Sequence, residues 1–191
     1  MGIDWAYDIH LPARNVATAL RATAALAHPG KGPVRVTLPD GAELLLPFTS
    51  GFRADPVDVR AGDGHVQLDT LLRFPVRDDV IRAWAEGDDS AEDPIRIGYI
   101  YLSVWYRYSP RPGYAHLSYT AATTGMSHLF ADSTSVRRVF TDLAASAGAV
   151  LCVLDREGDG DEICWRDGIE VAEPFDRMIL AAMAARWPAA G

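Results

Sequence analysis

The fold of this chain is decided by YIYLSVWYRYSPRPGYAHLSY, residues 99–119. It holds two segments rich in aromatic and aliphatic residues, the composition that favours strands. Between them stands Ser109-Pro110-Arg111-Pro112-Gly113, where two prolines and a glycine favour a turn over a continued strand. The stretch therefore predicts an antiparallel hairpin, with one strand over residues 95–108 and its return over 114–124.

Similar patterns extend outward in both directions. An Asp40-Gly41 turn joins apolar runs at 34–38 and 43–46, a strong hairpin signal. A helix over 133–148 is predicted with Val136, Val139, Phe140, Leu143 and Ala147 inward. Further strands are expected at 4–10, 65–74, 150–155, 162–166 and around 169–171, and further helices at 12–28, 78–86 and from Pro174 onward. These patterns predict an α+β fold: a mostly antiparallel, twisted sheet of about eight strands, covered on one face by about four helices.

An acidic segment, residues 88–94, lies near the middle of the chain and ends in Pro94. On either side of it a hairpin is followed by a helix, although the two parts share almost no residue identity. We therefore expect residues 1–191 to form a single compact domain, with possible pseudo-halves 1–87 and 95–191 packed as one unit.

The charge balance argues against several partners. The 191 residues carry 26 acidic and 18 basic side chains, a net charge of −8, and Lys31 is the only lysine. Nucleic acid and anionic lipid surfaces require clustered basic residues, so we expect neither as a partner. The longest apolar run, residues 147–154, is too short to span a bilayer, and the acidic opening does not resemble an export signal. The sequence indicates a soluble, cytoplasmic protein.

Motifs for metals, cofactors and nucleophiles are incomplete. The acidic stretch 155–162 begins like a calcium loop, but Arg166 stands where a bidentate glutamate is required. The segment around Ser127 lacks the second glycine of a nucleophile elbow. Cys152 and Cys164 are expected to be buried structural thiols, and the five histidines show no metal-ligand spacing. We therefore predict no metal and no cofactor.

Tyrosines are concentrated in the 99–119 stretch, which holds six of the seven. Strand alternation places Tyr99, Tyr101, Trp105 and Arg107 on one face and Ile100, Leu102 and Val104 on the other. If Tyr108 pairs with Tyr114, Tyr119 joins the Trp105 face and His116 lies opposite Tyr106; a shift of one residue reverses these partners. The aromatic face is either a second sheet face covered by helices or a binding surface.

Three hypotheses follow for the function. The first is a non-catalytic binding or interaction protein that uses the aromatic hairpin to recognise a protein partner. The second is a small-molecule enzyme or ligand-binding protein, with an aromatic-lined pocket, His116 or His128 as acid or base, and Arg107 holding an anion. The third is a homodimer with no ligand at this face. The candidate binding residues are Tyr99, Tyr101, Trp105, Arg107, His116 and Tyr119. A cavity with a histidine near a carboxylate would favour the second hypothesis, and a flat aromatic patch the first.

Overall fold

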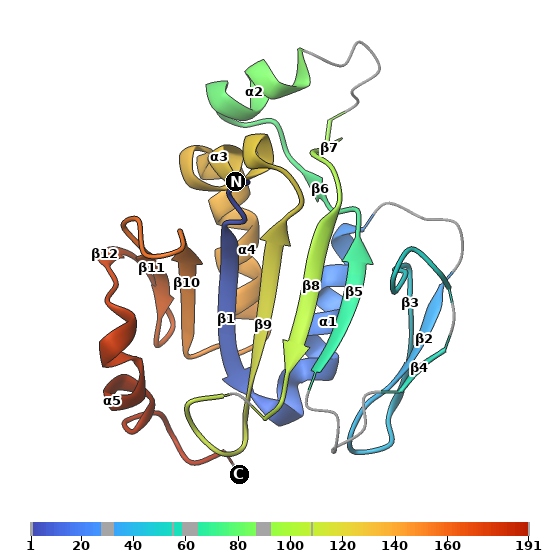
Figure 1. Cartoon of the computed structure of the whole chain (residues 1–191), viewed down its shortest axis with the longest axis vertical. Helices are drawn as coiled ribbons and strands as arrows, with labels where there is room; N and C mark the ends of the chain where they lie inside the picture. The colour runs from blue at the N-terminus through green and yellow to red at the C-terminus, as the bar shows by residue number, and fades with distance from the viewer. Residues whose placement is uncertain are drawn as a thin grey trace.

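A seven-stranded sheet dominates the computed structural model, which describes residues 2–27, 33–54, 56–58, 65–86, 93–107 and 109–190. The strand order is β12-β11-β10-β1-β9-β8-β5, and all neighbouring strands are antiparallel (Figure 1). The strands are β1 (Ala6–Pro12), β5 (His65–Thr70), β8 (Ile100–Trp105), β9 (Tyr114–Ala121), β10 (Leu151–Asp155), β11 (Glu162–Arg166) and β12 (Ile169–Pro174). Together with the helices, this sheet confirms the predicted α+β class.

Two smaller sheets lie beside the main one. The hairpin of β2 (Val34–Thr37) and β3 (Glu43–Leu46) is confirmed, with Val36 opposite Leu44. Its third strand is β4 (Val57–Asp58), which pairs in parallel with β2. A second sheet joins β6 (Arg73–Phe74) to β7 (Ile95–Arg96).

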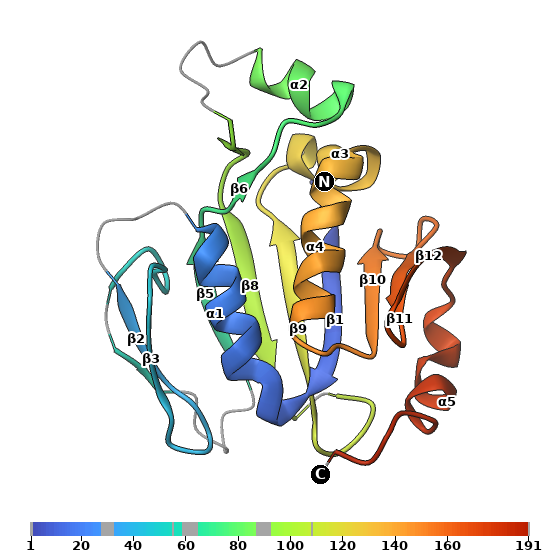
Figure 2. The ribbon, with the colours of Figure 1, turned by 180° about the vertical axis from the view of Figure 1, so that it is seen from behind.

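Helices α1 (Val16–Leu26) and α4 (Thr134–Ser146) cover one face of the main sheet (Figure 2). A single turn of 3-10 helix, η1 (Ala13–Asn15), leads from β1 into α1. The core forms between these helices and the sheet, where the ring of Tyr7 on β1 stacks on Phe140 of α4 with centroids 4.3 Å apart. All five residues predicted to face inward from α4 are buried. None of the helices in the described ranges has the length and apolar character needed to cross a membrane.

The top of the sheet in Figure 1 is closed by α2 (Asp79–Ala85) and α3 (Thr124–Asp132). Asp78 caps α2, because its carboxylate accepts the backbone N–H of Ile81 at 3.0 Å. The same carboxylate also accepts the backbone N–H of Ser135 at 2.7 Å and the hydroxyl of Ser133 at 2.8 Å. One side chain thus ties α2 to the start of α4.

The opposite face of the sheet carries only the C-terminal segment, made of η2 (Arg177–Ile179), α5 (Leu180–Ala184) and the residues that follow. This segment packs near β10 and one end of β1, where Trp187 contacts the rings of His10 and Tyr114. The guanidinium of Arg111 donates to the carbonyls of Ala184 and Ala185. The rest of this face, over β1, β9, β8 and β5, carries no helix of the described residues; we call it the open face.

Several predicted boundaries are wrong for identifiable reasons. The strand expected over 95–108 is split into β7 and β8 at Gly98, whose φ of +127° leaves the extended region. A Cβ at this position would lie 2.7 Å from the Sδ of Met126. The missing side chain of Gly98 therefore leaves room for Met126 of α3, a helix that the sequence did not indicate. The final helix does not begin at Pro174, because that residue still pairs with Glu162 as the end of β12.

The expected register of the central hairpin is wrong by one residue. Trp105 lies opposite His116, where the expectation placed Tyr106. Because side chains alternate between faces, the shift moves His116 to the Trp105 face and Tyr119 to the helix-covered face. Tyr119 is 1% exposed, and its hydroxyl lies 2.7 Å from that of Thr23 on α1. Its expected place in a binding surface is therefore corrected.

One sheet draws its strands from both sides of the acidic segment. β1 and β5 come from the part before it, and β8 to β12 from the part after it. Residues 88–92 of the segment lie outside the described residues; Asp93 accepts the backbone N–H of Val76 at 3.0 Å. The division into pseudo-halves stays a prediction, and the two parts share one sheet.

Candidate functional site

Two rows of side chains cross the open face at right angles to the strands. Strand register fixes both rows, because residues opposite one another in an antiparallel pair point to the same side. The first row, running from β5 to β1, is His65, Trp105, His116 and His10. The second row lies two residues away along each strand and consists of Gln67, Ser103, Ser118 and Asp8. Four strands thus bring imidazoles, hydroxyls, an indole and a carboxylate to one surface.

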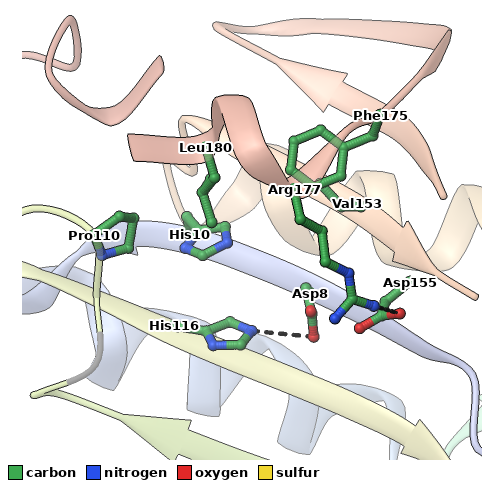
Figure 3. Close-up of a pocket in the computed structure, with 9 residues that line it drawn as sticks. All are labelled: Asp8, His10, Pro110, His116, Val153, Asp155, Phe175, Arg177 and Leu180. Atoms are coloured by element: carbon green, nitrogen blue, oxygen red, sulfur yellow. Dashed lines mark hydrogen bonds and ion pairs between the residues drawn. The ribbon is translucent and has the colours of Figure 1, made fainter. Parts of the chain in front are cut away.

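Two adjoining cavities lie on these rows and share Asp8, His116, Asp155 and Arg177. The narrower, about 240 Å³, lies under the C-terminal segment and also contacts His10, Phe175 and Leu180 (Figure 3). The wider, about 690 Å³, opens over β9 and β8 and is also lined by Ser103, Trp105, Ser118 and Thr120. We call the two together the open-face pocket; its larger part has the size of a small-molecule site.

Asp8 and His116 form an ion pair on the pocket floor. Nε2 of His116 lies 3.0 Å from Oδ1 of Asp8 (Figure 3). Burial opposes ionisation of Asp8, yet the facing charge of His116 and a hydrogen bond from Ser118 outweigh it and lower its pKa. Burial also opposes protonation of His116, and the charge of Asp8 outweighs it, so that the pKa of His116 is raised. Both effects favour the charged pair.

His10 is the most enclosed polar group of the floor, with 5% of its surface exposed. Its ring stacks on His116 with centroids 4.7 Å apart and lies 5.4 Å from the ring of Trp187. Burial, and then the charge of His116, lower the pKa of His10 to about 3. His10 is therefore neutral at physiological pH, and its Nδ1 has no hydrogen-bond partner among the described residues.

Arg177 forms one wall of the pocket. Its Nε donates to Oδ2 of Asp161 at 2.8 Å, and its Nη2 contacts Oδ1 of Asp155. Asp161 also accepts the backbone N–H groups of Arg156 and Gly158, which closes the acidic β10–β11 loop. These bonds give the carboxylate of Asp161 hydrogen-bond partners within the loop and on Arg177. Burial raises the pKa of Asp155 despite the nearby Arg177.

Trp105 bounds the wider part of the pocket. Its indole is half-buried and stacks on His65 of β5, with ring centroids 3.7 Å apart. His116 of β9 lies on the other side of Trp105. The indole therefore stands between His65 and the pocket. The hydroxyls of Ser103, Ser118 and Thr120 complete the lining at this side.

The structure brings together only part of the candidate set from the sequence. Trp105 and His116 line the open-face pocket. Tyr101 points to the same face, opposite Thr120, but lies outside the pocket lining. Tyr99 is 44% exposed and packs edge-on against Phe52, with ring centroids 5.3 Å apart. Arg107 is exposed beyond the end of β8 and is not among the lining residues.

His128, the alternative acid or base, lies elsewhere. It is exposed on α3, and its ring contacts Trp5 edge-on at 5.4 Å. The predicted role of Arg107 in holding an anion has no support in this geometry either, since the guanidinium that reaches the pocket belongs to Arg177. The thiols of Cys152 and Cys164 are buried on the helix-covered side, and burial raises the pKa of both.

Asp8, His10, Asp155 and Arg177 were missed by sequence reasoning. A signal existed for the first two, because Asp8 and His10 alternate within a strand whose other residues Tyr7, Ile9 and Leu11 are apolar. That pattern places both polar side chains on one face of β1. No local signal existed for Arg177, whose partners lie 16 and 22 residues away along the chain.

Among the residues that the structure describes, no three His, Cys, Asp or Glu side chains are arranged to hold a metal ion. The pocket is thus built from hydrogen-bonding and ion-pairing groups, with a proton donor at His116 and a neutral imidazole at His10. Such a set can bind a polar ligand or exchange a proton with it. No protein-family model, no curated protein and no solved structure matches this chain.

Proposed function

We propose that the chain is a binding protein and that its ligand occupies the open-face pocket. One observation carries the proposal: the buried Nδ1 of His10, on the pocket floor, has no hydrogen-bond partner among the described residues. Beside it, Oδ1 of Asp8 and Nε2 of His116 face each other at 3.0 Å as an ion pair. A buried polar atom left without a hydrogen bond costs about 1–3 kcal/mol, so native structures rarely keep one. A ligand group that bonds to Nδ1 of His10 recovers this cost.

The shape of the site supports the same proposal. The side chains of Asp8 and His116 keep 18% and 20% of their surface exposed, so a ligand can reach them. Their positions are fixed by neighbouring strands of one sheet and by the stack on His10. A site held by strands is formed before the ligand arrives, which lowers the entropy lost on binding.

Mapping of fragment binding tests this function. A library of small polar compounds is screened against the 15N-labelled protein, and amide shifts locate each hit. We expect hits to shift the amides of β1 and β9 around Asp8 and His116, and to lose affinity in His116→Gln. Glu170→Gln, an exposed change on β12, serves as the matched control. Hits that all map away from the open face would refute the proposal.

General acid catalysis is a second candidate, supported by the Asp8–His116 pair. The raised pKa of His116 keeps a proton available near neutral pH, and Asp8 stabilises the charged ring. If this function is right, a panel of chromogenic esters, phosphates and glycosides includes a substrate whose turnover falls at least about a hundredfold in His116→Gln. His128→Gln is the matched control. Equal turnover by the wild type and His116→Gln rules out this role.

A further inference from the structure

The charges around the open-face pocket are already compensated. Asp8 faces His116 at 3.0 Å, and Asp155 faces Arg177, which also holds Asp161 at 2.8 Å. An added anion would meet the carboxylates of Asp8 and Asp155, and an added cation would meet His116 and Arg177. Either would compete with an existing ion pair for its partner and would meet a like charge beside it. The pocket therefore suits a ligand that carries no net charge.

The hydrogen-bonding groups of the pocket are mixed in kind. Asp8 and Asp155 present acceptors, Arg177 and His116 present donors, and the three hydroxyls of Ser103, Ser118 and Thr120 do both. A carbonyl compound would satisfy the donors only, and an amine would satisfy the acceptors only. Hydroxyl groups on the ligand satisfy both, because each donates one hydrogen bond and accepts others. The lining thus favours several hydroxyls on one ligand.

Trp105 adds an apolar surface to this polar lining. His65 stacks on one side of the indole, and the pocket lies toward His116 on the other. An aromatic ring beside hydroxyl-binding groups suits a ligand with hydroxyls at its edge and C–H groups on a flat face. A cavity of about 690 Å³ accommodates a ring of this kind with a substituent.

We propose that the open-face pocket binds a neutral, hydroxyl-rich ring, the chemistry of a saccharide. This inference rests on the proposed binding function and specifies its ligand class. The ring lies against Trp105, its hydroxyls reach Ser103, Ser118 and Asp8, and His10 receives or donates the innermost hydrogen bond at Nδ1. Binding leaves both ion pairs intact.

A panel of defined probes tests the ligand class. Glucose, galactose, N-acetylglucosamine and maltose are compared with inorganic phosphate and agmatine, by saturation-transfer NMR and titration calorimetry. We expect at least one sugar to bind with a Kd of about 1 mM or lower. Asp8→Asn and Ser118→Ala are expected to weaken binding at least about tenfold. Trp105→Phe, which keeps an aromatic ring, is expected to weaken it less than Trp105→Ala.

Controls on distant residues separate lost contacts from lost folding. Asp79→Asn and Trp84→Ala change exposed residues of α2, and both should bind sugar as the wild type does. Thermal unfolding of every variant checks that it is folded. If phosphate or agmatine shifts the His116 signals and no sugar does, the saccharide inference is wrong while the binding function stands. If no probe or fragment perturbs the pocket, both are wrong.

Discussion

Asp8 controls the charge of His116, since the two side chains meet in a largely enclosed site. Replacing Asp8 by Asn removes the larger of the two charges that raise the pKa of His116, and it leaves the smaller effect of Asp155 and the burial that lowers this pKa. We therefore expect the pKa of His116 to fall in Asp8→Asn, below its ordinary value of 6.5. NMR titration of the imidazole protons measures the change, with Asp79→Asn as the matched control. An unchanged His116 titration contradicts the ion pair.

The same pair makes stability depend on pH in a defined window. The raised pKa of His116 means that its contribution is complete below about 6.5 and is lost as pH rises through the folded value. The lowered pKa of Asp8 means that its contribution is present above about 3.8 and is lost as pH falls through the folded value. The Asp8–His116 pair therefore stabilises the fold most between these limits.

His10 acts in the opposite sense, because the fold disfavours its protonated form. Its pKa falls to about 3, so between roughly pH 6.5 and 3 the unfolded chain binds the extra proton. This group makes the folded state less stable by at most about 1.4 kcal/mol for each pH unit lost in that range. We expect the free energy of unfolding of His10→Phe, measured by chemical denaturation, to fall less steeply than that of the wild type as the pH is lowered. His128→Phe is the control, and an identical acid profile for both variants would contradict the prediction.

At the scale of elements, the C-terminal segment shields one end of the pocket. Trp187 is 6% exposed and contacts both His10 and Tyr114, so its indole removes His10 from water. In Trp187→Ala we expect the pKa of His10 to rise toward its ordinary value, because burial is the largest cause of its lowering. NMR titration measures it. Met178→Ala on the same segment is the control, since Met178 is 87% exposed.

The sequence predicted elements well where the apolar period is unambiguous. The α4 stripe through Phe140 is buried as expected, and so is one face of α1, with Val16, Leu20 and Thr23. It predicted faces poorly where the turn length sets the register. The observed pairing is shifted by one residue from the expected one, and this shift decides whether His116 or Tyr119 points to the open face. Local patterns contain no information on this offset, and none on Arg177, which reaches Asp155 and Asp161 through tertiary packing.

At the scale of the whole molecule, the larger hydrophobic core lies in the helix-covered layer. Phe140 is fully buried and contacts the rings of Tyr7, Tyr119 and Phe130. We expect Phe140→Ala to lower the free energy of unfolding by about 3–5 kcal/mol, through lost burial and a new cavity. Phe52→Ala is the comparison, with an expected loss of about 0.5 kcal/mol because Phe52 is 60% exposed. Denaturant unfolding distinguishes them, and similar losses would contradict this placement of the core.

The central position of β1 has a consequence for how the chain folds as it is made. Residues 6–12 pair with 114–121 on one side and 151–155 on the other, so both partners are synthesised long after β1 itself. Until then Tyr7, Ile9 and Leu11 have no sheet to join, and their apolar side chains stay exposed or in temporary contacts. Pairings of this sequence separation fold slowly. The strand that supplies Asp8 and His10 is thus made before both of its partner strands and is enclosed only after they have been made.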